Sequence, residues 1–129
     1  MSDGRRILVV EDNELNLKLV RDVLSHAGYQ VFEARTGEQG VQLADELLPD
    51  LILMDLQLPG IDGTEALRQL RSSSRTQGVS VVAVTAFAMA EDRERAFRSG
   101  FDGYVEKPIS VRELPAQVQE LLERGNSHG

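Results

Sequence analysis

Polar residues stand directly behind four short apolar runs of this 129-residue chain. Glu11 and Asp12 follow "ILVV", and Asp55 follows "LILM". Thr85 follows "VSVVAV", and Lys107 follows "YVE". If these runs are parallel strands, the polar residues stand at their carboxyl ends, where ligands bind in open parallel sheets. The pattern therefore predicts one site that combines carboxylates, a hydroxyl and an ammonium group.

The three acids favour a metal ion. If the first and third runs are neighbouring strands, Glu11, Asp12 and Asp55 meet in one cleft and repel each other. Shifted pKa values, a cation or both must offset that repulsion. Oxygen ligands without His or Cys suit a hard divalent ion, and Mg²⁺ needs only one or two carboxylates because it keeps several waters.

The same residues favour phosphoryl transfer to a carboxylate. Asp is a competent nucleophile for this reaction. Mg²⁺ and Lys107 would neutralise charge on the transferring oxygens, and Thr85 offers a hydroxyl between them. Hydrolysis of the Ser/His type is disfavoured because neither His26 nor His128 follows a predicted strand.

Strands and helices alternate along the chain. Strands are predicted at 7–10, 29–34, 51–54, 79–84 and 104–106. Apolar residues at helical spacing lie between and after them. The stripes are Val20, Val23, Leu24 and Ala27; Val41, Ala44, Leu47 and Leu48; Ala66, Leu67 and Leu70; and Leu114, Val118, Leu121 and Leu122. A fourth helix, at about 89–99, has a thin apolar face of Met89, Ala96 and Phe97. This order predicts a doubly wound α/β fold, a parallel sheet with helices on both faces.

Local signals mark where helices begin. Asn13 is a candidate N-cap, and Thr36 with Gln39 has the spacing of a capping box. Ser110 and Glu113 have the same spacing. Pro115 would be the fifth residue of the helix that starts there and would remove a backbone hydrogen bond. Either that first turn is distorted or the helix begins later. The second strand ends near Arg35 with no distinctive residue.

Composition limits the class of protein. A formal charge of −7 disfavours direct binding of nucleic acid. The chain has no Cys, so it has no disulfide framework or thiolate metal site. No run is apolar for long enough to insert into a membrane, and we expect a cytoplasmic protein. We expect one domain over residues 1–124, a tail over 125–129 and a stand-alone chain.

The motifs together resemble a known family. They are "VVEDN" (9–13), "LILMDLQLPGIDG" (51–63), "VVAVTA" (81–86) and "YVEKPI" (104–109). In this order they resemble the receiver domain of two-component response regulators, over essentially the whole chain. Stand-alone regulators of chemotaxis and cell division are the nearest kind. The resemblance implies a flavodoxin-like (βα)5 fold with strand order 2-1-3-4-5.

The resemblance also implies a role for each site residue. Asp55 is expected to be the phosphoacceptor, Lys107 its phosphate partner, Thr85 the switch hydroxyl and Tyr104 the switch aromatic. The expected Mg²⁺ ligands are Glu11, which acts mainly through water, Asp12, Asp55 and the backbone carbonyl of Gln57. The Lys107–Pro108 peptide is expected to be cis.

The function implied is a signalling switch. A sensor histidine kinase or histidine phosphotransfer protein would donate a phosphoryl group to Asp55. The chain would catalyse only its own phosphorylation and dephosphorylation, so it would not be an enzyme. A downstream protein target would bind the face made by the fourth helix, the fifth strand and the fifth helix. We further hypothesise that Phe87 shields the acyl phosphate from water.

Three other functions fit these residues less well. A phosphohydrolase of the haloacid-dehalogenase kind needs a second acid two residues after the nucleophile, where this chain has Gln57. A flavodoxin-like binder of nucleotide or flavin needs a phosphate-friendly first loop, but "VEDNE" is acidic. A pure interaction module would not need the acids, Thr85 and Lys107 together.

Overall fold

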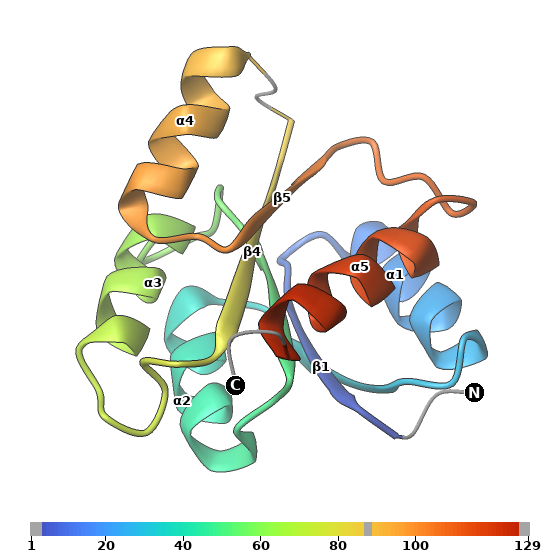
Figure 1. Ribbon diagram of the computed structural model, residues 1–129, viewed down its shortest axis with the longest axis horizontal. Coiled ribbons are helices and arrows are strands. Elements are labelled where there is room, and N and C mark those ends of the chain that lie inside the picture. Colours follow the sequence, from blue (N-terminus) through green and yellow to red (C-terminus); the bar gives the residue numbers. More distant parts are fainter. Residues whose placement is uncertain (1–3, 87–88, 127–129) are drawn as a thin grey trace.

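The computed structural model describes residues 4–86 and 89–126, in which five strands alternate with five helices (Figure 1). The strands are β1 (Arg6–Val10), β2 (Gln30–Ala34), β3 (Leu51–Asp55), β4 (Ser80–Thr85) and β5 (Gly103–Glu106). The helices are α1 (Glu14–His26), α2 (Gly37–Leu47), α3 (Gly63–Arg71), α4 (Ala90–Ser99) and α5 (Leu114–Asn126). In this part of the chain, no helix is both long and apolar enough to cross a membrane.

All five strands are parallel and lie in the order β2-β1-β3-β4-β5. In the central pair, Val10 of β1 lies opposite Met54 of β3. Because the strands run in one direction, their carboxyl ends meet at the same edge of the sheet. The predicted doubly wound fold and the order 2-1-3-4-5 are confirmed.

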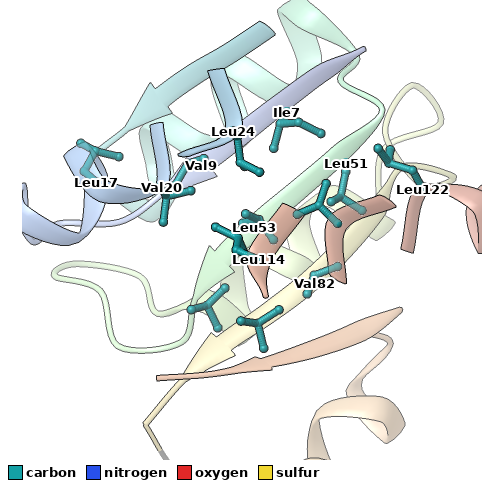
Figure 2. Close-up of a cluster of buried hydrophobic side chains, with 13 residues drawn as sticks. Ile7, Val9, Leu17, Val20, Leu24, Leu51, Leu53, Val82, Leu114 and Leu122 are labelled. Atoms are coloured by element: carbon teal, nitrogen blue, oxygen red, sulfur yellow. The ribbon is translucent and has the colours of Figure 1, made fainter. Parts of the chain in front are cut away.

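Two hydrophobic clusters cover the two faces of the sheet. Side chains of α1 and α5 pack on one face, where Ile7, Leu24 and Leu114 are fully buried (Figure 2). Side chains of α2, α3 and α4 pack on the other face, where Ile52 and Leu67 are fully buried. Successive residues of a strand point to opposite faces, so a strand buried on both faces is apolar throughout. The continuous apolar runs reflect this arrangement.

The helix starts agree with the local signals. Asn13 Oδ1 accepts a hydrogen bond from Asn16 N at 3.0 Å, as an N-cap does. Thr36 Oγ1 accepts one from Gln39 N at 3.0 Å. The reciprocal bond of the capping box is displaced by one residue, because Gln39 Oε1 accepts from Arg35 N at 2.8 Å instead of from Thr36.

Pro115 is accommodated by a later helix start. A turn follows Ser110, whose Oγ accepts from Glu113 N at 3.2 Å, and α5 begins only at Leu114. Pro115 is therefore the second helical residue. Its missing N–H falls in the first turn, where the backbone has no intrahelical partner. Of the two predicted possibilities, the later start is correct.

Three apolar residues placed on core stripes are exposed. Leu48 was expected to continue the stripe of α2, but it is the C-cap, has a left-handed φ of 48° and is 44% exposed. The chain leaves the helix at this residue, before Pro49. On α4, Met89 and Phe97 are 68% and 45% exposed, and only Ala96 is buried. The spacing of the apolar residues predicted which side of α4 faces the sheet, but not how little of that side is buried.

Candidate functional site

Three carboxylates converge at the carboxyl ends of β1 and β3. Glu11, Asp12 and Asp55 each have a carboxylate oxygen within 4.8 Å of the others. Glu11 and Asp55 are each only 3% exposed, whereas Asp12 is open to solvent. The pairing of β1 with β3 produces this convergence, since it brings the two strand ends side by side. The acidic cleft expected from the sequence is present.

Lys107 joins the buried acids. Its Nζ lies 3.0 Å from Glu11 Oε1 and 3.1 Å from Asp55 Oδ2. Burial lowers the pKa of Lys107, but its bonds to Glu11 and Asp55 outweigh burial and raise that pKa above its usual value. The ammonium group is therefore held in its charged form between the two carboxylates.

The surroundings of Glu11 shift its pKa. Burial and a hydrogen bond with Asp55 raise its pKa, although the bonds from Lys107 and from Asn13 N act in the opposite direction. The Asn13 N–H donates to Glu11 Oε2 at 3.2 Å. The pocket thus contains more negative charge than one lysine balances, and such a pocket attracts a cation.

The Asp55 side chain is held at both oxygens. Oδ1 accepts a hydrogen bond from Gln57 N at 3.0 Å, and Oδ2 faces the ammonium group of Lys107. The first residue of α3 lies close to the backbone of Asp55: a Cβ at Gly63 would lie 2.5 Å from the Asp55 carbonyl oxygen. Only glycine allows this approach, so the residue type at position 63 is dictated by the position of Asp55.

Thr85 ends β4 at the same edge of the sheet. Asp55 lies opposite Val84 in the β3–β4 register, so Thr85 stands one residue beyond Asp55. Thr85 is buried, and its carbonyl accepts from Lys107 N at 2.8 Å. Gln57 is the second residue after β3, and its backbone N–H donates to Asp55 Oδ1.

Tyr104 lies on β5, outside the carboxylate cluster. Its ring is half-buried, and the Arg93 guanidinium of α4 lies 5.4 Å from the ring centre. Burial, followed by the nearby charge of Asp92, raises the Tyr104 pKa, and Arg93 lowers it. The Lys107–Pro108 peptide is cis, as expected. Phe87, the expected shield, and Ala88 on the expected docking face lie outside the described residues.

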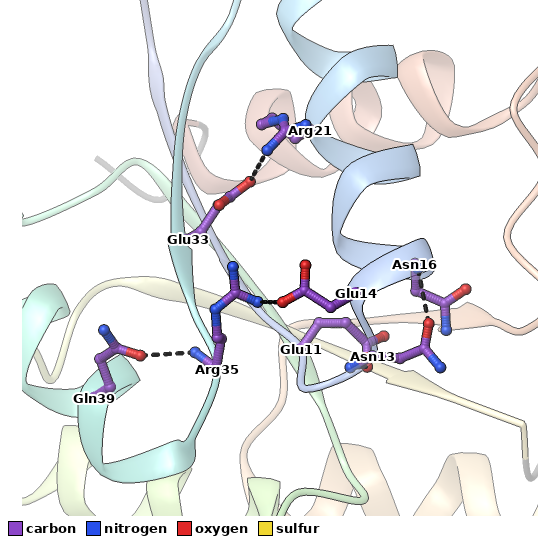
Figure 3. A network of polar contacts seen from close by, with 8 residues as sticks. All are labelled: Glu11, Asn13, Glu14, Asn16, Arg21, Glu33, Arg35 and Gln39. Atoms are coloured by element: carbon purple, nitrogen blue, oxygen red, sulfur yellow. Dashed lines mark hydrogen bonds and ion pairs between the residues drawn. The ribbon is translucent and has the colours of Figure 1, made fainter.

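One ion pair beside the pocket was not predicted from the sequence. Arg35, which follows β2, pairs with Glu14 in the first turn of α1 (Figure 3). The backbone of this region reaches the pocket directly, because Glu11 N donates to Ala34 O at 3.0 Å. The signal that could have revealed this ion pair is a basic residue after β2 (Arg35) together with an acidic residue after β1 (Glu14). Their pairing depends on β2 lying next to β1.

The donor set fits a magnesium ion. All the candidate ligands are oxygens, two of the three carboxylates are buried, and the third is open to solvent. Mg²⁺ binds one or two carboxylates and retains several waters, so it needs a site that is partly open. Glu11, Asp12, Asp55 and the backbone of Gln57 are the groups that would hold it.

Comparison with known proteins agrees with the geometry. Residues 7–119 match the family model of the response regulator receiver domain. The polar-differentiation response regulator DivK of Brucella ovis is 46% identical over 118 residues, which are 92% of this chain and 96% of that protein. DivK of Brucella anthropi matches equally well.

Solved structures show the same fold. A CheY-like receiver domain protein of Methanospirillum hungatei has a TM-score of 0.86 at 30% identity, over 97% of this chain and 98% of that one. The receiver domain of the sensor histidine kinase PA1611 of Pseudomonas aeruginosa has a TM-score of 0.85 at 36% identity, over 93% and 98%. That structure has a magnesium ion coordinated in its active-site cleft.

Proposed function

This chain belongs to the family of response regulator receiver domains, and we propose that Asp55 is the residue at which it accepts a phosphoryl group. The family functions in general as a phosphoacceptor switch of two-component systems. The observation that carries the assignment is the buried Asp55 carboxylate, held 3.1 Å from Lys107 and within 4.8 Å of two further acids.

The proposed reaction is a transfer between two proteins. A carboxylate oxygen of Asp55 attacks the phosphorus of a phosphohistidine on a sensor histidine kinase or histidine phosphotransfer protein. An O–P bond forms, the N–P bond breaks, and its electron pair returns to the imidazole. Lys107 stabilises the charge that gathers on the transferring oxygens. The chain acts on its own Asp55 and has no other proposed substrate.

The proposed cofactor is Mg²⁺, held by Glu11, Asp12, Asp55 and the carbonyl of Gln57. When bound, it neutralises charge on the phosphoryl oxygens. The chain's own contribution is to hold Asp55 at both oxygens and to keep Glu11 and Asp55 out of bulk water. The Mg²⁺-containing relative supports this assignment by similarity.

The proposed switch consists of Thr85, Tyr104 and α4. Phosphorylation adds negative charge, toward which the Thr85 hydroxyl turns while Tyr104 changes rotamer. The shallow packing of α4, with only Ala96 buried, favours two discrete positions of that helix. A protein target would read the change on the face of α4, β5 and α5. The receiver domain over 1–124, the tail over 125–129 and the cytoplasmic location stay predictions.

The test is phosphorylation by a small donor. Incubation with acetyl phosphate and Mg²⁺ should add one phosphoryl group, detected by intact mass. The addition should disappear with a chelator and in Asp55→Asn. The exposed control Asp22→Asn should react like the wild type. An unmodified wild-type chain, or a modified Asp55→Asn, contradicts the proposal.

A phosphohydrolase is the alternative to exclude. The residue two positions after Asp55 is Gln57, whose backbone N–H binds Asp55 and whose side chain is not acidic. Continuous turnover of p-nitrophenyl phosphate, in place of one phosphoryl group per chain, would favour this alternative.

A further inference from the structure

The first turn of α2 contacts the loop that carries Gln57. This loop covers residues 56–62, between β3 and α3, and is called here the β3–α3 loop. A Cβ at Gly37 would lie 2.6 Å from Ile61 Cγ1 and 2.8 Å from the Ile61 carbonyl oxygen. A Cβ at Gly60 would lie 2.7 Å from a carboxylate oxygen of Glu38. The helix start and the loop therefore touch with no space for another carbon atom.

The base of the β3–α3 loop is fixed by main-chain hydrogen bonds. Leu56 N donates to Val84 O at 3.1 Å, and Gly63 N donates to Leu56 O at 3.2 Å. Gln57 N binds the Asp55 carboxylate. These bonds hold the two ends of the loop but not its outer half, which includes Gly60 and Ile61. That half is supported by side-chain packing: Leu58 and Ile61 are partly buried against the core cluster on this face of the sheet, and Ile61 also contacts α2 at Gly37.

The start of α2 is itself tied to the acidic pocket. Its N-cap Thr36 accepts from Gln39 N, and the preceding strand ends at Ala34, whose carbonyl accepts from Glu11 N. The position of α2 is therefore set relative to Glu11. Through Gly37 and Ile61, α2 in turn sets the position of the β3–α3 loop. No residue of α2 belongs to the acidic cluster; the helix contacts β1 at Val10 through Gly40 and the β3–α3 loop through Gly37.

We infer that Gly37 is a positioning residue for the metal site: its missing side chain lets α2 pack against the β3–α3 loop, which carries the proposed ligand Gln57, without displacing that loop. The inference rests on the proposed function. A Cβ closer than 3.0 Å to a backbone oxygen forces one of them to move. In Gly37→Ala the new methyl group meets both the Ile61 side chain and the Ile61 carbonyl oxygen, a backbone atom of the loop, so α2 and the loop must move apart.

The test measures Mg²⁺ affinity and loop position separately. By isothermal titration calorimetry, Gly37→Ala should bind Mg²⁺ about tenfold more weakly, the lower end of the loss typical when groups that support metal ligands are changed. In metal-free protein, the amide NMR signals of residues 57–62, apart from Pro59, should shift. Ile61→Ala, which removes the side-chain half of the contact, should weaken Mg²⁺ binding by a smaller factor.

The matched control is Gly103→Ala on β5. Its Cβ would lie 2.5 Å from Leu121 Cδ2, the end of a flexible side chain remote from the loop. It should lower the melting temperature, as overpacking does, and leave Mg²⁺ affinity and the signals of residues 57–62 unchanged. A merely structural role of Gly37 predicts this same behaviour for Gly37→Ala.

The outcomes separate this inference from the proposed function. If the wild-type chain does not bind Mg²⁺, the proposed function fails. If the wild type binds Mg²⁺ and folded Gly37→Ala binds within twofold of it, only the inference fails. Should Gly37→Ala not fold, Ile61→Ala decides: wild-type affinity in that variant overturns the inference, and weakened affinity with shifted loop signals supports it.

Discussion

At the scale of single residues, the site depends on charges that balance only in part. Lys107 contacts two of the three acids, and the raised pKa of Glu11 shows that its burial beside Asp55 is not fully offset. A buried charge that loses its partner destabilises the folded state. The role of Lys107 in the metal-free protein is therefore structural as well as chemical.

Lys107→Met should destabilise the chain most when no metal is present. Without the ammonium group, Glu11 and Asp55 lose their counter-ion, and we expect a loss of about 1–3 kcal/mol in a chelator. Saturating Mg²⁺ supplies positive charge, so the loss there should be smaller. Urea denaturation in both conditions measures the difference. The exposed control Lys18→Met should show no such dependence, and an equal loss for Lys107→Met in both conditions contradicts the prediction.

Glu65 on α3 should remain ionised at unusually low pH. Hydrogen bonds from Arg68, then from Gln69, lower its pKa from 4.5 to about 2. Because the folded pKa is the lower one, the stabilisation is complete above pH 4.5 and is lost as the pH falls toward 2. An NMR titration of the Glu65 carboxyl carbon should give this value. In Arg68→Ala the pKa should return toward 4.5, and an unchanged value would contradict the assigned cause.

At the scale of elements, the strands place the chemistry and the helices set its freedom to move. β1 and β3 lie between neighbours on both sides, are buried except at Arg6, and lead to the acids at their carboxyl ends. α4, by contrast, buries only Ala96 and presents Met89 and Phe97 to solvent. A helix with so little apolar contact shifts at low cost, which suits the element proposed to report phosphorylation.

Leu48 should be a stabilising position for substitution. It has a left-handed φ of 48° and is 44% exposed, so its side chain gains little from burial. A non-glycine residue in this conformation costs roughly 1–2 kcal/mol. Leu48→Gly should therefore raise the free energy of unfolding, by about 0.5–1 kcal/mol once the entropy of glycine is included. Urea denaturation tests this.

The matched control for Leu48 lies in the same helix. Gln42 is exposed and in the interior of α2, where Gly costs about 1 kcal/mol. Gln42→Gly should therefore lower the free energy of unfolding while Leu48→Gly raises it. Two losses of equal size would show that residue 48 does not occupy the left-handed region in solution.

At the scale of the whole molecule, one sheet separates two cores. Ile7 is fully buried on the face covered by α1 and α5, and Ile52, on the neighbouring strand, is fully buried on the other face. Ile7→Val and Ile52→Val should each cost about 0.5–1.5 kcal/mol. The double variant should lose the sum within about 0.5 kcal/mol, because the two side chains share no cavity. A larger deviation in urea denaturation would mean that the sheet transmits strain between the cores.

Most of the fold and the convergence of the acids followed from the sequence. Parallel strands buried on both faces are apolar runs, and their ends are marked by the polar residues that follow, so Glu11, Asp55, Thr85 and Lys107 could be found one strand at a time. The ion pair of Arg35 with Glu14 was missed, since it emerges only when the residues after two neighbouring strands are considered together. Leu48 was misplaced because periodicity does not show where a helix ends.

The close packing around glycines could not be predicted from the sequence either. Nothing in the pattern around Gly37 or Gly63 indicates that a backbone oxygen lies within 3 Å of where a Cβ would stand. Such information exists only once α2, α3 and β3 are packed. The thin cover of α4 likewise depends on how far Met89 and Phe97 lie from the sheet, which their spacing does not determine.

The main-chain hydrogen bond from Lys107 N to Thr85 O joins the carboxyl ends of β4 and β5. The strands that lead to the acids, β1 and β3, each have a neighbouring strand on both sides, whereas β5 is the last strand of the sheet. A movement of Thr85 is therefore passed to the backbone of Lys107 and to an edge strand that has a neighbour on one side alone.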